Sequence, residues 1–508
     1  MAKTAIIIGA GLGGMATAIR LAHAGWKVKV LEKNMRVGGK LSCAGENGFL
    51  WDVGPSLITM PFVLRDLFEA IGHDMEHYLE LVPLNPICRY FFPDGKVLNA
   101  WADQHHFQIE LARLEKDHGE SLEAFMRYAR GIYDLAGEAY LFPSSRGRFS
   151  ARALKSLHHL PRALTRATMA QVIKRYFKNP KAQQFFLRYA THNGSSPYLA
   201  SATFNMVSYI ERRDGGWYIR GGIYRLAEAL EKCACDLGVE FLLDAEVSEI
   251  ALRSRGRFSK PRATGALLRS GLRFEGDAVI CNTDFHHAWT RLLQKRAHPR
   301  AIRRLERQAL SSSPFVILWG VKQRFEKLSH HNVFFSSDYP AEFDDIFKKK
   351  RPPEEPTIYV GISARSDPTQ APEGQDNYFV LVHTPALEPD HHWDQLRGPY
   401  RNRVLDRLEK MGLEGLRRHI VCERVITPSD FAARTNAYRG SIYGAVSHSR
   451  SSVLRRPSHR SAEVNGLYFV GGTVRPGGGI PLVLLSARDA AETVISDSEK
   501  EPHETGEN

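Results

Sequence analysis

Residues 4–14 read Thr-Ala-Ile-Ile-Ile-Gly-Ala-Gly-Leu-Gly-Gly and are followed by a helical pattern over residues 15–24. This order predicts a strand, a tight turn and a helix, which is the start of a dinucleotide-binding fold. In such a unit Gly9 allows the turn, Gly11 lets the backbone approach a pyrophosphate, and Gly14 lets the helix pack on the strand. The start of the helix faces the anion. The predicted nucleotide contacts are Gly9, Gly11, Leu12, Gly13 and Gly14.

A second strand ends in an acidic residue. Val28-Lys-Val-Leu-Glu32 places Glu32 where this fold needs a carboxylate for the ribose hydroxyls. An ordinary βαβ turn without a ligand is the alternative. A nucleotide site is favoured because the strand, the helix and the acidic residue follow one another at the expected spacing. Nicotinamide and flavin cofactors share this fingerprint, so it does not choose between them.

The residues after Glu32 make that choice. Lys33 is followed by Gly38-Gly-Lys40 and then by Trp51-Asp-Val-Gly-Pro55. This pattern resembles the family of two-domain FAD oxidoreductases that includes the flavin amine oxidases and the carotenoid desaturases. The resemblance implies FAD as cofactor, with the basic residue near its phosphates or ring, whereas a plain hairpin turn is the alternative for the glycine pair. The contacts implied are Lys33, Gly39, Lys40, Gly54 and Pro55.

A second glycine loop lies near the other end of the chain. A predicted strand over residues 466–470 leads into Gly471-Gly-Thr-Val-Arg-Pro-Gly-Gly-Gly-Ile-Pro481, and a helix begins near Leu482. Such a loop offers amide donors and a positive helix end to an electron-rich ring. The run resembles the C-terminal signature of bacterial phytoene desaturase-type enzymes rather than that of amine oxidases. The FAD contacts implied are Gly472, Thr473, Gly479, Ile480 and Pro481.

Three middle segments follow the same family order. They are a glycine-rich turn at 215–222 leading into a helix over 223–237, a strand at 238–243, and a strand at 278–284. We expect the backbone of Val247 to meet the adenine, and we expect Asn282 to lie beside the cofactor.

The resemblance implies the chemistry. It is that of an FAD-dependent desaturase in carotenoid biosynthesis, which removes two hydrogens from adjacent carbons of a long polyene and uses quinone or oxygen as electron acceptor. Arg475 is the residue expected nearest the ring, although phytoene desaturases commonly carry histidine there. A structural role for Arg475 is the alternative. Tyr443-Gly444 and Ser447-His448 resemble 3,4-desaturases and terminal oxygenases, which act late in the pathway, more than the first phytoene desaturase.

Other functions stay open on sequence alone. A carotenoid terminal oxygenase or isomerase could use the same scaffold. A flavin amine oxidase and a flavin-binding protein without turnover are further alternatives.

The chain of 508 residues is too long for one ordinary core. We predict an α/β protein in which a Rossmann-like FAD-binding domain (1–75, 215–290 and 455–495) is interleaved with an α+β substrate domain (76–214 and 291–454). Residues 496–508 are polar and acidic, and we expect a disordered tail there.

The net charge of +13 is concentrated between residues 146 and 188, which contain eleven basic residues and no acidic one. Apolar residues are interleaved, including Met169, Val172, Ile173, Phe177, Phe185 and Phe186. This combination predicts a helical segment facing anionic lipid, with a solvated basic hairpin as the alternative. No run of 18 apolar residues is present, and glycines interrupt the apolar start of the chain. We therefore expect a cytoplasmic protein on the inner face of a membrane, and we do not expect nucleic acid as a partner.

The six cysteines predict no disulfide framework. No set of histidines and cysteines has metal-ligand spacing, so we predict no metal. The adjacent histidine pairs, among them His330-His331, are interpreted as surface or loop residues.

Overall fold

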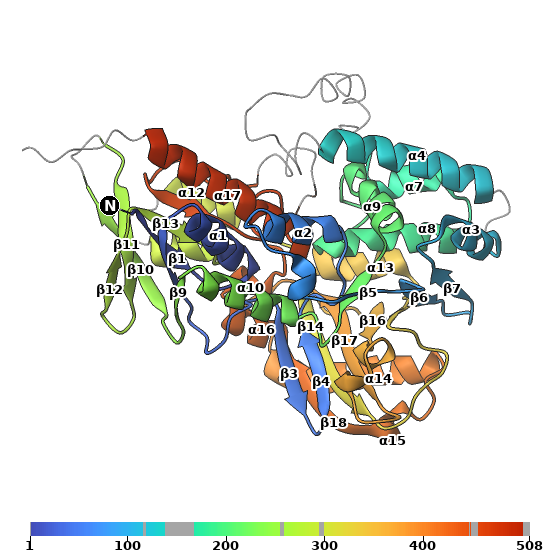
Figure 1. The fold of residues 1–508 in the computed structure, drawn as a ribbon. Helices are drawn as coiled ribbons and strands as arrows, with labels where there is room; N and C mark the ends of the chain where they lie inside the picture. The colour runs from blue at the N-terminus through green and yellow to red at the C-terminus, as the bar shows by residue number, and fades with distance from the viewer. Residues whose placement is uncertain are drawn as a thin grey trace, which may run out of the picture.

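The computed structural model describes residues 2–114, 118–137, 167–254, 259–293, 299–446, 448 and 456–500. It is a mixed α/β fold built on two sheets with a separate group of helices (Figure 1). The basic residues from 146 to 166 lie outside the described residues.

The first sheet is parallel and contains the N-terminal strand at its centre. Its order is β19 (Leu467–Phe469), β13 (Ala278–Cys281), β1 (Thr4–Ile8), β2 (Lys27–Leu31) and β9 (Glu240–Leu242). Ile7 pairs in register with Ile280 on one side and with Val30 on the other. The central strand reads as a continuous β-branched run because both faces of a parallel sheet are covered.

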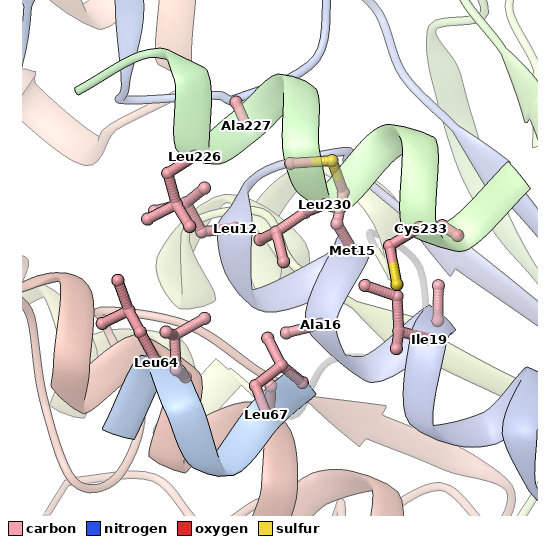
Figure 2. Packing of buried hydrophobic residues seen from close by; sticks show 14 of the residues in the cluster. Leu12, Met15, Ala16, Ile19, Leu64, Leu67, Leu226, Ala227, Leu230 and Cys233 are labelled. Carbon is pink, nitrogen blue, oxygen red and sulfur yellow. The ribbon is translucent and has the colours of Figure 1, made fainter. Parts of the chain in front are cut away.

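Helices cover one face of this sheet. They are α1 (Leu12–His23), α2 (Pro61–Glu69), α10 (Arg225–Asp236) and α17 (Ile480–Lys500). Figure 2 shows α1 between α10 and α2, where Met15 and Ile19 are fully buried against Leu230. Burying a side chain of this size stabilises the fold by about 1.5–3 kcal/mol.

A small antiparallel sheet covers the other face. It consists of β10 (Val247–Arg253), β11 (Arg262–Leu268) and β12 (Arg273–Glu275), and Ile250 and Ala266 pack with Ile6 and Ile8 of β1. Two short antiparallel pairs, β3 (Ser42–Glu46) with β4 (Phe49–Val53) and β5 (Leu81–Pro83) with β8 (Trp217–Ile219), lead towards the second sheet.

The second sheet is mixed. Its order is β18 (Ile420–Ile426), β14 (Ser313–Val321), β17 (Asp376–Thr384), β16 (Ile358–Gly361), β15 (His331–Phe334), β6 (Cys88–Phe91) and β7 (Val97–Ala100). Helix α14 (Trp393–Lys410) packs on it through Trp393 and Tyr400, whose rings contact Phe315. Shorter helices complete this region and its connections: α11 (Phe285–His287), α12 (Pro299–Glu306), α13 (Tyr339–Asp344), α15 (Leu416–His419) and α16 (Pro428–Thr435).

A helical group stands over the β6 and β7 edge, at the upper right of Figure 1. It contains α3 (Gln104–Ala112), α4 (His118–Ala136), α7 (Met169–Tyr176), α8 (Pro180–Leu187), the 3-10 segment η4 (Arg188–Asn193) and α9 (Met206–Asp214).

This group corrects part of the membrane prediction. The apolar side chains of 169–186 that were expected to enter lipid are instead buried in a core with Phe107 and Phe125. The exposed basic side chains of this stretch are Lys174, Arg175 and Lys178. The amphipathic pattern was correct, but its apolar face packs on α3, α4 and β6. In the described residues no helix has the length and apolar character needed to cross a bilayer.

The C-terminal helix also corrects a boundary. Helix α17 continues to Lys500, so residues 496–500 are helical rather than part of a disordered tail. Asp497 explains the extension, because its carboxylate pairs with Arg460 and accepts a hydrogen bond from the Tyr468 hydroxyl at 3.1 Å. Residues 501–508 lie outside the described residues.

Candidate functional site

The two glycine loops meet at one cavity of about 770 Å³. A Cβ atom placed on Gly13 would lie 3.3 Å from the Cα of Gly471, so the loops touch. Asn282 lies between them, and its Nδ2 donates a hydrogen bond to the Val470 carbonyl at 3.0 Å. The two distant segments of the sequence therefore form one wall.

Most of the residues predicted from the sequence line this cavity. They are Gly9, Gly11, Leu12, Gly13, Glu32, Lys33, Gly39, Lys40, Gly54, Pro55, Val247, Asn282, Gly472, Thr473, Gly479, Ile480 and Pro481. Gly14 does not line it. A Cβ on Gly14 would lie 2.2 Å from the Gly9 carbonyl oxygen, so this glycine serves the contact between helix and strand.

Glu32 is buried at the end of β2 with its carboxylate at the cavity. Its Oε2 accepts a hydrogen bond from the Ala10 amide at 2.7 Å, and its Oε1 accepts two from Asn34. A carboxylate has about four acceptor positions. Oε2 therefore has one free acceptor position for a hydroxyl group in the cavity.

Lys40 and Asp284 both line the cavity and attract each other electrostatically, while the Lys40 ammonium donates a hydrogen bond to the Ile442 carbonyl. Burial lowers the pKa of Lys40, and the Asp284 carboxylate counteracts this. Burial likewise raises the pKa of Asp284. Its Oδ2 accepts no hydrogen bond from the described residues, although the Oδ1 accepts from the His286 amide. Asp284 was not singled out from the sequence, yet it offers a ligand a buried acceptor.

Asp52 of the Trp-Asp-Val-Gly-Pro motif holds two backbone segments together. Asp52 accepts hydrogen bonds from the amides of Ile223 and Tyr224 at 2.8 and 2.9 Å, and so fixes the chain before α10. Burial raises the pKa of Asp52 to about 6, against the effect of these two hydrogen bonds.

Arg475, which was predicted to lie nearest the ring, does not line the cavity. Its side chain is exposed, and its Nε donates to the Arg456 carbonyl at 3.2 Å. Arg456 is the arginine that reaches the cavity, where its Nη1 donates to the Gly472 carbonyl at 2.9 Å. No motif in the sequence marks Arg456.

The rest of the cavity is walled by the second sheet, the helical group and the segment between β4 and α2. Its apolar lining includes Leu57, Met60, Ile87, Leu135, Phe204, Val207, Ile210, Val316, Phe379 and Leu381. The interpretation of His330 and His331 as surface or loop residues is wrong, because both are buried and His331 lines the cavity.

Residues 12–495 match the family described as flavin containing amine oxidoreductase. The chain belongs to this family. It is an FAD-dependent oxidoreductase, as the resemblance of the segments after Glu32 implied.

Curated relatives cover nearly the whole chain. A 4,4'-diapolycopene oxygenase of Methylomonas sp is 37% identical over 97% of this chain and 98% of its own. A 1-hydroxycarotenoid 3,4-desaturase of a Flavobacterium sp. is 35% identical, with 97% and 99% covered.

Solved structures share the fold at low identity. An oxidoreductase from Methanosarcina mazei has a TM-score of 0.63 at 17% identity, covering 98% of this chain and 100% of its own. A putrescine oxidase bound to putrescine has a TM-score of 0.62 at 15% identity, covering 98% and 99%.

Proposed function

We propose that the protein is an FAD-dependent desaturase that acts on a long-chain polyene in carotenoid biosynthesis, of the phytoene desaturase or 3,4-desaturase type. The observation that carries the proposal is the single cavity that joins two glycine loops to an extended apolar wall. The names of the curated relatives support the substrate class.

The cavity residues fit the cofactor. We assign the pyrophosphate to the Gly9–Gly14 turn and the start of α1, and a ribose hydroxyl to the free acceptor position of Glu32. Asp284 Oδ2 offers a buried acceptor to a further hydroxyl, and Lys40 supplies a buried cation. When bound, FAD supplies the hydride acceptor for the reaction.

The chain's own residues position the substrate. The apolar wall buries the polyene and excludes water from the reacting carbons. Each methylene that leaves water contributes about 0.8 kcal/mol. A chain of carotenoid length therefore prefers a hydrocarbon environment by on the order of 20 kcal/mol.

Such a substrate is never free in the cytosol, so the enzyme must collect it from a bilayer. We propose a peripheral position on the inner face of the membrane, with exposed basic residues such as Lys174, Arg175 and Lys178 on anionic lipid. Quinone or oxygen is the proposed electron acceptor.

A terminal oxygenase on the same scaffold is the second candidate. It is favoured by the 37% identity to the diapolycopene oxygenase, which exceeds the 35% identity to the 3,4-desaturase. An isomerase would also fit the cavity, but neither of these two relatives is named as one.

Product analysis separates these functions. The gene is expressed in cells that make C30 or C40 polyenes, and the pigments are separated by chromatography with mass detection. A product two mass units lighter per new bond with red-shifted absorption supports the desaturase. A product with added oxygen supports the oxygenase, and unchanged pigments contradict both.

A further inference from the structure

A polar cluster interrupts the apolar wall of the cavity. Arg188 and His192 come from η4, and His331, Tyr359 and His383 come from the neighbouring strands β15, β16 and β17. All five line the cavity. They stand on the second sheet and the helical group, whereas the segments assigned to FAD come mainly from the first sheet and its loops.

Arg188 lacks an acidic partner within the part of the chain that the structure describes. Its Nη1 donates to the Tyr90 hydroxyl at 3.2 Å and to His192 Nε2 at 3.0 Å, while no described residue accepts from its Nε or Nη2. The neighbouring carboxylate of Glu211 is engaged elsewhere, because it accepts from the Tyr189 hydroxyl at 2.7 Å and faces Arg212 Nη2 at 3.9 Å.

The imidazoles around Arg188 do not compensate its charge. Burial and the Arg188 charge lower the pKa of His192 to about 3 and that of His383 to about 4. Burial also lowers the pKa of His331. These histidines are therefore neutral at pH 7. Together with Arg188 they offer hydrogen bonds but no negative charge.

The outer members of the cluster hold His331 in place. Its Nδ1 shares a 2.6 Å hydrogen bond with the Tyr359 hydroxyl, which is also 2.6 Å from Ser56 Oγ. The Nε2 of His331 is buried and has no hydrogen-bond partner in the described residues. His383 is fixed in the same way, by Ser312 Oγ at 2.9 Å from its Nδ1.

This arrangement is costly if the cavity holds only hydrocarbon. A buried charge without a partner loses several kcal/mol of hydration, and a buried polar nitrogen without a hydrogen bond costs about 1–3 kcal/mol. A polyene of carbon and hydrogen alone accepts no hydrogen bond from Arg188. A polyene that carries an oxygen atom does.

We propose that Arg188, with His192, His331 and His383, binds an oxygen function on the polyene, such as a hydroxyl or carbonyl group. The inference rests on the proposed function, because it presupposes a polyene in this cavity. It narrows the substrate class from any long polyene to one that an earlier hydroxylation, hydration or oxidation has supplied with oxygen. The polar contact would also fix the position of the polyene along the apolar wall.

Binding to the FAD-loaded enzyme tests this assignment. The probes are a C30 polyene hydrocarbon and the same chain with a terminal hydroxyl or aldehyde, each delivered in detergent micelles. Affinity is followed by the absorption shift of the polyene. A hydrogen bond to a charged donor corresponds to about a 10- to 100-fold change in Kd. We therefore expect the oxygenated chains to bind at least about 10-fold more tightly to the wild type.

Three variants locate the effect. Arg188→Met should bind both kinds of chain with equal affinity, whereas Arg188→Lys should retain part of the preference. Tyr90→Phe is the matched control, since it removes a hydroxyl beside Arg188 but leaves the cation and is expected to keep the preference. If Arg188→Met does not fold with flavin bound, His331→Gln provides the second test and should reduce the preference.

The other outcomes overturn the assignment. Equal binding of all chains by the wild type, or a preference that survives in Arg188→Met and His331→Gln, contradicts it while leaving the proposed function intact. An isoprenoid quinone carries the same carbonyl chemistry, so decylubiquinone is included. If Arg188→Met weakens only the quinone, the cluster serves the electron acceptor instead. If no polyene binds the wild type, the proposed function itself fails.

Discussion

Replacing Gly13 with alanine tests the contact between the two glycine loops. Gly13 lies in the first turn of α1 and is not in the left-handed region, so alanine meets no backbone strain there. Helix propensity alone would favour alanine by up to about 1 kcal/mol. The added Cβ, however, would lie 2.9 Å from Asn282 Nδ2, 3.1 Å from Val483 Cγ1 and 3.3 Å from Gly471 Cα. Overpacking of this kind costs about 1–3 kcal/mol.

The matched control is Gly131→Ala in α4, where a new Cβ would meet no described atom within 4 Å. We expect the free energy of unfolding, measured in urea on the apoprotein, to be about 1–3 kcal/mol lower for Gly13→Ala than for Gly131→Ala. FAD affinity, measured by flavin fluorescence, should fall only for Gly13→Ala. Equal stability and equal FAD affinity of the two variants would refute the contact.

Three further predictions concern other sites. Gly11→Val, whose Cβ would lie 2.7 Å from Asn282 Oδ1, should purify without the flavin absorption band; a fully yellow variant would contradict the assignment. Asp52 has a pKa raised from 3.8 to about 6, so its contribution to stability is present below pH 4 and is lost as the pH rises through 6. Asp52→Asn should remove about 2 kcal/mol of this pH dependence between pH 4.5 and pH 7, measured by urea unfolding. Changing Lys174, Arg175 and Lys178 to Gln should weaken binding to anionic vesicles by about 1 kcal/mol per charge, most at low salt; unchanged binding would leave them as solvated surface residues.

The parallel sheet was predictable because its sequence signals are local. The runs that became β1, β13 and β19 are short, apolar and rich in β-branched or aromatic residues, and each ends in a turn. The glycine turns after β1 and β19 also fixed which ends of the strands face the cofactor. That both turns share one cavity followed from the family order, and the contact of Gly13 with Gly471 agrees with it.

The direction of loop side chains was not predictable. Arg475 lies among glycines in a loop. Because a loop has no repeating period, the sequence does not predict the direction of the Arg475 side chain, which is exposed in the structure. Arg456 reaches the cavity from the segment before β19, 16 residues before Gly472, and this segment carries no motif that would have indicated it.

Burial of polar and amphipathic residues depends on what covers them. The stretch 169–186 has one apolar face, and only the tertiary structure shows that α3 and α4 cover it instead of lipid. His330 and His331 are adjacent on or beside a strand, where neighbours point to opposite faces. Their partners Ser366 and Tyr359 come from later in the chain, so composition alone suggested exposure.

Hydrogen–deuterium exchange on the apoprotein and on the FAD-loaded protein tests the central claim most directly. That claim is that the loops following β1 and β19 close around the same FAD molecule. It predicts that FAD slows exchange of the backbone amides in residues 9–15 and in residues 471–483 together, with the same dependence on FAD concentration. Protection of only one of these two segments, or of neither, would contradict it.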